Sequence, residues 1–139
     1  MKKYFVDTCV WRDFYEDRQS TDKSKIGSHA SKFIKNILDK RHTILINKYI
    51  LYELKNKYTD EEINELLMFF KYLNILENVE ISNSEYNETK IISKNKNLPI
   101  VDCIIAIQSR NYDAIVITRD NHFLKKLSYI CKAELPESI

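Results

Sequence analysis

Hydrophobic and polar residues follow two different rhythms along this chain, and the order of the two rhythms indicates a mixed α/β protein. Short runs rich in apolar and β-branched residues have the length of strands, whereas longer segments repeat their apolar residues at the spacing of a helix with one buried face. The expected strands are 2–6, 42–47, 74–81 (the weakest), 113–118 (the clearest) and 127–131. The expected helices are 8–17, 28–40, 48–58, a helix that begins at 59, 82–94 and 99–110, followed by a short helical turn at 123–127.

Several sequence signals locate the helix starts. Residues 59–62 (Thr-Asp-Glu-Glu) and 82–85 (Ser-Asn-Ser-Glu) have the pattern of a capping box, in which the first and last side chains bond to each other's backbone N–H groups. Pro99 suits the first turn of a helix, where its missing N–H group leaves no hydrogen bond unmade. The helix that begins at 59 has a clear apolar stripe, which comprises Ile63, Leu66, Leu67, Phe70 and Leu73.

Strands and helices alternate along the whole chain, which predicts a mainly parallel sheet covered by helices on both faces. The chain has 139 residues, enough for one domain around one core, and no internal repeat divides it. A composition of 44% hydrophobic and 30% charged residues, with one Gly and two Pro, argues against a disordered or collagen-like chain. We therefore expect a single α/β domain over residues 1–139.

Charge is distributed unevenly, although the net charge is only +2. Residues 23–57 contain nine Lys and Arg against two acidic residues, whereas residues 58–91 contain eight acidic residues against two Lys. Such stretches can be solvated helix faces, or the basic stretch can contact a polyanion such as nucleic acid. Charge alone does not decide between these two interpretations.

The sequence carries no signal for export or for a membrane. Asp7 and Arg12 interrupt the apolar residues that follow the N-terminal lysines, and no apolar run is long enough to cross a bilayer. The three cysteines have no paired spacing and are expected to be reduced and mostly buried, and the three scattered histidines do not form a zinc-binding pattern. These features predict a cytoplasmic protein.

One carboxylate lies where the hydrophobic pattern predicts burial. Asp102 stands in the segment LPIVDCIIAI (98–107), whose other residues are apolar or proline, so it must be desolvated, paired or bound to a ligand. Three further acids lie at or after the carboxyl ends of expected strands, where open α/β sheets bind ligands. Asp7 ends the first strand, Glu53 lies early in the helix after the second, and Asp120 follows the clearest strand by two residues.

Each of these acids has an ordinary structural alternative. Asp7 can cap the following helix, and Glu53 can be a solvated helix residue. Asp120 can stabilise a turn together with Asn121, and Asp102 can interact with the positive end of its helix dipole. The positions of all four at the same kind of place favour a shared site.

A shared site for four carboxylates needs protons or a cation. Two like charges about 4 Å apart repel by roughly 4 kcal/mol at an effective dielectric constant of about 20. Ligation by oxygen atoms is what Mg²⁺ and Mn²⁺ prefer, and such a cation activates water and stabilises charge on a phosphoryl group. We therefore expect a hard divalent cation at Asp7, Glu53, Asp102 and Asp120.

Three segments form an ordered set. The first is YFVDTCVW (4–11), a strand that ends in Asp followed by Thr, and the second is YILYELKNK (49–57), a helix with Glu-Leu at its centre. The third (98–123) contains D-x-x-I-A and then, after a strand, T-x-D-x-x-F. In this order the segments resemble the PIN-domain family, and its VapC-like toxin ribonucleases in particular. The matching residues of the third segment are Asp102, Ile105, Ala106, Thr118, Asp120 and Phe123.

The resemblance implies a Mg²⁺-dependent endoribonuclease, with Mn²⁺ as an alternative cofactor, built as a compact three-layer α/β/α sandwich. Asp7 and Asp102 would be the principal metal ligands, and Asp120 would join them or bind a second ion. Glu53 would bind through water or orient the attacking water. The resemblance also implies an RNA substrate, a homodimer and a small cognate antitoxin. The residues implied to hydrogen-bond to the metal ligands are Thr8, Thr118 and, as an amide supplement, Asn121.

The sequence departs from the family at position 9, where Cys replaces the usual Ser or Asn. Cys9 is expected to pack as a small hydrophobic residue. Asn121 either supplements the metal site or serves a turn, and His122 either contacts phosphate or is simply exposed. The apolar run 67–70 is either an interface for a second subunit or an antitoxin, or one face of a deeply buried helix.

Other classes of function compete with this interpretation. A haloacid-dehalogenase-like phosphatase needs a second Asp two positions after the first, where Cys9 stands. A phospho-receiver needs an acidic pair beside the end of the first strand, and Asp7 is the one acid in residues 5–10. A PIN-domain nuclease without a toxin role and a non-catalytic PIN-fold binding module fit the same residues, so both stay open.

Overall fold

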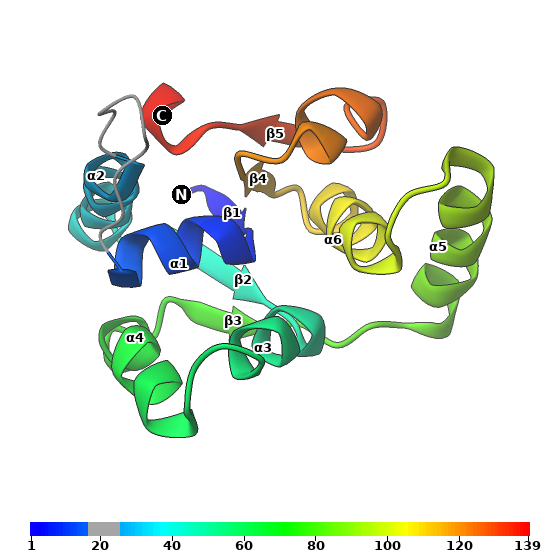
Figure 1. Cartoon of the computed structure of the whole chain (residues 1–139). Coiled ribbons are helices and arrows are strands. Elements are labelled where there is room, and N and C mark those ends of the chain that lie inside the picture. The colour runs from blue at the N-terminus through cyan, green and yellow to red at the C-terminus, as the bar shows by residue number, and fades with distance from the viewer. Residues whose placement is uncertain (17–25) are drawn as a thin grey trace.

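A parallel β-sheet forms the centre of the protein (Figure 1). The computed structural model describes residues 1–16 and 26–139. In this part of the chain the sheet has five strands in the order β3-β2-β1-β4-β5, and each neighbouring pair is parallel. The strands are β1 (Lys3–Val6), β2 (Thr43–Ile46), β3 (Leu76–Asn78), β4 (Ile115–Ile117) and β5 (Lys132–Glu134).

Strand β1 lies in the middle of the sheet. Its Phe5 pairs with Leu45 of β2 on one side and with Val116 of β4 on the other. Tyr4, Phe5 and Val6 are fully buried, as expected for a strand that is covered on both faces. The apolar run at the start of the chain therefore forms the centre of the core.

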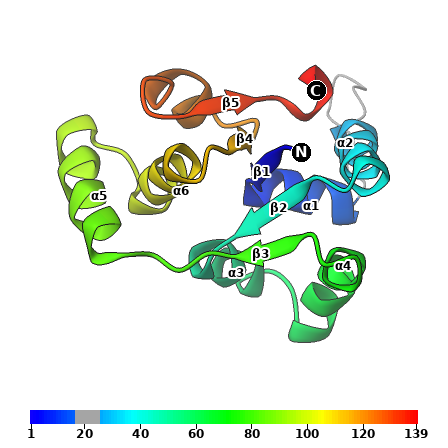
Figure 2. The same ribbon diagram turned by 180° about the vertical axis from the view of Figure 1, so that it is seen from behind.

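Helices cover both faces of the sheet. The connections from β1 to β2 and from β2 to β3 run toward one edge, whereas the connection from β3 to β4 returns across the sheet. Because parallel crossovers are right-handed, the returning connection places its helices on the opposite face. Helix α1 (Thr8–Glu16) lies in front of β2 in Figure 1 and behind it in Figure 2. This arrangement confirms the expected three-layer α/β/α sandwich.

The helix bounds agree with the sequence pattern to within a few residues. The predicted helix 28–40 begins earlier, at 26, while 48–58 ends at 55 and 82–94 extends to 96. Asp17, the predicted end of the first helix, lies outside the described residues. No helix in the described ranges is both long and apolar enough to cross a bilayer. The helices are α1 (Thr8–Glu16), α2 (Ile26–Lys40), α3 (Lys48–Lys55), α4 (Asp60–Tyr72), α5 (Asn83–Lys96), α6 (Ile100–Asn111), the π-helical η1 (His122–Lys126) and the 3₁₀-helical η2 (Pro136–Ser138).

Both predicted capping boxes are confirmed. The Thr59 hydroxyl accepts the backbone N–H of Glu62 at 3.2 Å, and the Glu62 carboxylate accepts the N–H of Thr59 at 3.0 Å. Ser82 and Glu85 form the same reciprocal pair at 3.1 and 3.0 Å. Pro99 stands one position earlier than predicted, as the N-cap of α6 rather than in its first turn. These caps set the starts of α4, α5 and α6.

The last predicted strand, at 127–131, is wrong. These residues form a turn after η1, in which the N–H groups of Ile130 and Cys131 donate to the Leu127 carbonyl at 3.0 and 3.2 Å. Strand β5 follows this turn, at Lys132–Glu134. Leu127 and Cys131 are buried, so a helical turn packed on the core produced the apolar pattern that the prediction interpreted as a strand.

Two other strands are shorter than predicted. Strand β3 occupies only the middle of the range 74–81, and β4 begins after the start of the range 113–118. In both places a turn residue with positive φ comes first, Asn74 at 57° and Asp113 at 55°. Both residue types tolerate this left-handed conformation, which ends the preceding helix before the strand can begin.

Candidate metal centre

Asp7 lies at the carboxyl end of the central strand, and its side chain is fixed by three neighbours. Its backbone N–H continues the sheet by donating to the carbonyl of Ile117 at 2.9 Å. One carboxylate oxygen accepts the N–H of Thr8 at 2.9 Å, and the other accepts the Thr118 hydroxyl at 2.8 Å and the Cys9 thiol at 3.5 Å. Only 8% of the Asp7 surface is exposed. Strand β1 therefore presents a buried carboxylate to the end of β4.

Two threonines extend this network to other acids. The Thr8 hydroxyl donates to Glu53 Oε1 of α3 at 2.8 Å. The Thr118 hydroxyl, which donates to Asp7, also accepts the backbone N–H of Asp120 at 2.9 Å. Residues that lie far apart in the sequence are thus joined around the carboxyl ends of β1 and β4.

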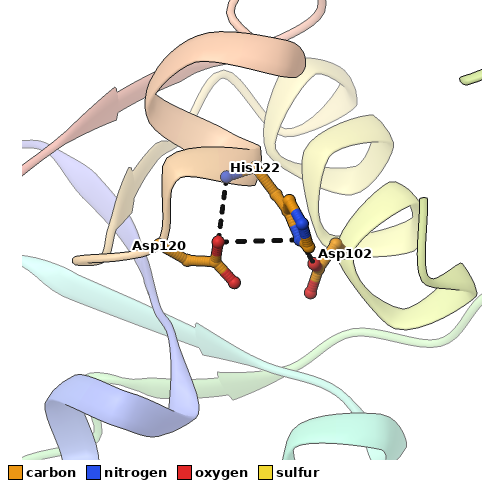
Figure 3. A group of neighbouring side chains, drawn as sticks. All are labelled: Asp102, Asp120 and His122. Atoms are coloured by element: carbon orange, nitrogen blue, oxygen red, sulfur yellow. Dashed lines mark hydrogen bonds and ion pairs between the residues drawn. The ribbon is translucent and has the colours of Figure 1, made fainter. Parts of the chain in front are cut away.

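Asp102 and Asp120 approach each other through His122 (Figure 3). His122 Nδ1 lies 2.8 Å from Asp102 Oδ2 and 3.6 Å from Asp120 Oδ1. The backbone N–H of His122 donates to Asp120 Oδ1 at 2.9 Å. One ligand atom from each of these three residues lies within 4.8 Å of the other two, and residues 1–16 and 26–139 hold no other such metal-binding group. Asp7 and Glu53 lie outside this tight group and join it through the threonines.

Burial and mutual repulsion raise the pKa values of the central carboxyl groups. Burial raises the pKa of Asp7 to about 6, and the charge of Asp102 adds to this, whereas hydrogen bonds from Thr118 and Thr8 oppose it. Burial likewise raises the pKa of Asp102, with contributions from the charges of Asp120 and Glu53, while His122 opposes the shift. The carboxylates are therefore close enough to destabilise one another's charge, which is the condition that favours a bound cation.

The four acids predicted from the sequence thus gather at one edge of the sheet. Asp102 lies in the first turn of α6, as expected, and Thr8 and Thr118 contact the acids. Asn121 is exposed, and among the described residues its side chain caps no helix and bonds to none of these carboxylates, so its role stays a prediction.

Sequence reasoning missed the contact of His122 with the acids. The signal was the spacing, since His122 follows Asp120 by two residues, but a histidine at that position can also face solvent. Cys9 packs against the core, as expected, and its thiol also donates to Asp7, a contact that the sequence did not predict. Burial and the Asp7 charge raise the Cys9 pKa to about 12, so this thiol stays protonated as a hydrogen-bond donor.

The site also coincides with a reversal in the topology of the sheet. The connection after β1 leaves on one face and the connection before β4 arrives from the other, so the two neighbouring strands form a topological switch point. In open α/β sheets this is where ligands bind. The fold and the acidic residues at the carboxyl ends of the strands define the class of this protein: an α/β/α sandwich with a carboxylate site at the topological switch point.

A family model described as PIN domain matches residues 4–127 of the 139-residue chain. This match covers most of the sequence, so the chain belongs to the PIN-domain family. The resemblance noted from the sequence motifs is thereby confirmed. No curated protein matches the chain at a significant level.

Several solved structures share the fold across nearly their whole length. A toxin–antitoxin complex from Klebsiella pneumoniae is 15% identical with a TM-score of 0.66, and covers 96% of this chain and 97% of its own. VapBC2 from Rickettsia felis, bound to a DNA fragment from its promoter, is 20% identical with a TM-score of 0.61. The match covers 96% of this chain and 98% of the VapBC2 chain. FitAcB from Neisseria gonorrhoeae is 14% identical with a TM-score of 0.63, and the match covers 98% of this chain and 99% of the FitAcB chain. At these identities the likeness is one of fold.

Proposed function

We propose that this protein is a metal-dependent endoribonuclease that hydrolyses RNA phosphodiester bonds. The observation that carries the proposal is the gathering of Asp7, Glu53, Asp102 and Asp120 in one hydrogen-bonded network at the carboxyl edge of the sheet. Membership of the PIN-domain family, whose members are generally nucleases, supports the same reaction class.

The donor set fits a hard divalent cation. Carboxylate oxygens predominate among the donors. Burial and mutual repulsion raise the pKa of Asp7 and of Asp102, so a bound cation would offset the repulsion between their negative charges. We take Mg²⁺ or Mn²⁺ as the cofactor. When bound, the cation stabilises negative charge on the phosphoryl group and lowers the pKa of a water molecule.

The residues of the site have separate tasks in this proposal. Asp7 and Asp102 hold the cation, and Asp120 completes the same shell or holds a second ion. Glu53 is the most suitable group to orient the attacking water, because α3 brings it to the edge of the network and Thr8 fixes one of its oxygens. Thr118 holds Asp7 and the Asp120 backbone in register, so it is a positioning residue.

RNA is the proposed substrate because of the family and the charge pattern. Within the predicted basic stretch, Lys48 and Lys55 are exposed on α3, the helix that carries Glu53. Exposed cations attract a polyanionic backbone without reading its sequence. The RNA sequence that is cut is therefore chosen by other contacts.

The similarity to toxin–antitoxin structures supports a role as the toxin of a type II pair, acting in the cytoplasm as a homodimer and held inactive by a small antitoxin. A patch of exposed apolar side chains on α4, defined by Met68, Phe69 and Tyr72, supports the binding of a protein partner. A PIN-domain nuclease without a toxin role, acting in RNA processing, is the second candidate.

The test is RNA cleavage by wild type, Asp7→Asn and Asp102→Asn, with Mg²⁺ and with EDTA. We expect cleavage only by wild type and only with the metal. Asp39→Asn is the matched control, because Asp39 is exposed on α2 and should leave the rate unchanged. Equal cleavage by wild type and both site variants would refute the proposal. Equal cleavage of DNA and RNA would remove the ribonuclease assignment but keep the metal site.

A further inference from the structure

We propose that His122 is itself a ligand of the bound cation, through Nδ1, and that this nitrogen makes the site prefer Mn²⁺ over Mg²⁺. The inference rests on the proposed function, since it requires that the acidic site holds a cation. It adds a nitrogen donor to a site that would otherwise bind metal through oxygen alone.

The geometry of the described side chains already resembles a ligand shell (Figure 3). His122 Nδ1 lies 2.8 Å from Asp102 Oδ2 and 3.6 Å from Asp120 Oδ1. Neighbouring donors on an octahedral ion with bonds of roughly 2.1–2.2 Å lie about 3 Å apart. The separation from Asp102 is already close to this value, and the ligand atoms of the three residues lie within 4.8 Å of one another, so small side-chain rotations bring them around one ion.

The backbone holds His122 in this place. Its N–H donates to Asp120 Oδ1 at 2.9 Å, and its carbonyl accepts the N–H of Leu127 at 2.8 Å, which closes the π-helical turn of η1. The next residue, Phe123, is fully buried in the core. The His122 side chain keeps 33% exposure, so the ring lies at the mouth of the site. Single π-helical turns occur frequently at functional sites, and here the turn aims the ring at the carboxylates.

The chemistry of the imidazole sets the expected preference. Binding through Nδ1 requires the neutral tautomer with its proton on Nε2, so the hydrogen bond to Asp102 is replaced by two bonds to one ion. Carboxylate oxygen suits both ions, but Mn²⁺ is a transition metal that also accepts imidazole nitrogen, whereas Mg²⁺ keeps to oxygen and gives up its water reluctantly. A nitrogen donor therefore strengthens Mn²⁺ binding more than Mg²⁺ binding.

The experiment measures metal binding and not only cleavage. Titration calorimetry with Mn²⁺ and with Mg²⁺ gives the affinity ratio for wild type, His122→Ala and His122→Asp, and pulsed electron paramagnetic resonance of bound Mn²⁺ reports any nitrogen coupling. We expect nitrogen coupling in wild type and none in either variant. His122→Ala should weaken Mn²⁺ binding by about tenfold or more, the loss that follows removal of even a second-layer partner of a metal ligand. The Mg²⁺ affinity should change less.

His42→Ala is the matched control, because His42 precedes β2 at the opposite edge of the sheet and bonds to the backbone N–H of Lys2. It should keep both the coupling and the affinity ratio. His122→Asp supplies an oxygen in place of the nitrogen, so it should retain binding while shifting the ratio toward Mg²⁺. Circular dichroism verifies that each variant is folded.

The possible failures are distinguishable. Mn²⁺ binding without nitrogen coupling, or an unchanged affinity ratio in a folded His122→Ala protein, would overturn this inference and leave the proposed nuclease intact. A wild-type protein that binds neither cation would overturn the proposed function and this inference together.

Discussion

Asp7 is the most buried of the four clustered carboxylates, and its position was predictable. An Asp that directly follows a buried parallel strand must lie at the carboxyl edge of the sheet, whatever the rest of the fold does. Its hydrogen bonds were not predictable, because they depend on the pairing of β1 with β4, which brings Thr118 within 2.8 Å of it. The contact between His122 and Asp102 was not predictable either, because the spacing of residues along the chain does not determine the orientation of the imidazole ring.

The raised pKa of Asp7 predicts how the metal-free protein responds to pH. The folded state binds a proton up to about pH 6, whereas the unfolded chain releases it near 3.8, the ordinary pKa of an Asp side chain. Stability from this group is thus full below the unfolded pKa and is lost as the pH rises through the folded one. In EDTA at pH 7.5, Asp7→Asn should unfold at a higher urea concentration than wild type, with a gain of up to about 3 kcal/mol.

Two further measurements test that explanation. At pH 4, where the wild-type carboxyl group is protonated, the stability difference between the two proteins should shrink. A divalent cation should reverse the ranking at pH 7.5, because only wild type gains from binding it. An Asp7→Asn protein that is less stable than wild type in EDTA at pH 7.5 would contradict the explanation.

The hydrogen bonds of Thr118 lead to a second prediction for a single side chain, which concerns both stability and metal binding. Thr118→Val keeps the shape but removes the hydroxyl that joins Asp7 to the Asp120 backbone. Because both groups then lose a buried partner, we expect a loss of about 1–3 kcal/mol in the free energy of unfolding and weaker metal binding. Urea unfolding and metal titration measure the two effects. Thr118→Ser keeps the hydroxyl and should resemble wild type, and an equal defect in both variants would contradict a hydrogen-bonding role.

A helix or strand was predictable where its signal came from residues that are close together in the sequence. Where the signal came only from burial, the type of element was ambiguous. The capping boxes at Thr59 and Ser82 depend on neighbours in the sequence, and both were found. The buried residues Leu127 and Cys131 carried an apolar signal that fits either a strand or a helical turn. The choice between these depended on how η1 packs on the sheet, which no short window of sequence contains.

The buried residues of helix α5 are polar, which gives a prediction at the scale of the element. Its buried residues are Glu85 and Thr89, and the Glu85 carboxylate accepts bonds from the Ser82 N–H and from Asn111 on α6. Glu85→Ala should therefore lower the free energy of unfolding by about 2–3 kcal/mol, because it removes a cap and takes one acceptor from the buried Gln108 amide, whose Nε2 donates to Glu85 Oε1 at 3.4 Å.

Glu62→Ala is the matched control for this prediction, since Glu62 occupies the same capping position in α4 at a more exposed site. It should lower the stability by about 1 kcal/mol or less. Urea unfolding gives both values, and amide hydrogen exchange shows whether α5 loosens selectively. Equal losses from the two substitutions would contradict the role assigned to the link between α5 and α6.

At the scale of the whole molecule, the alternation of strands and helices was enough to predict the sandwich, and the partner surface was not predictable. The apolar run 67–70 left open whether the helix was deeply buried or part of an interface. The structure divides the run, because Leu67 and Phe70 lie in the core while Met68 and Phe69 are 52% and 61% exposed. A helix with apolar residues on two faces has room for a partner on the second face.

The α4 patch leads to a prediction about assembly. The double variant Met68→Ser and Phe69→Ser should lose binding to the proposed antitoxin while keeping its fold and its RNA cleavage, since these side chains lie outside the core. Co-purification with the product of a small neighbouring reading frame measures the loss. Tyr129→Ser is the control, as Tyr129 is 61% exposed elsewhere on the molecule. Undiminished antitoxin binding by the double variant would place that interface on another surface.

The bond between Thr118 and Asp7 joins residues that are 111 positions apart. When the ribosome has synthesised the chain as far as β3, it has made Asp7 at the end of β1. It has not yet made β4, the strand that pairs with β1 and is followed by Thr118. The nascent chain therefore lacks a complete set of cation-binding groups until β4 and the residues after it have emerged. If the finished protein degrades RNA, its own messenger and the ribosome that translates it are spared for most of the time that synthesis takes.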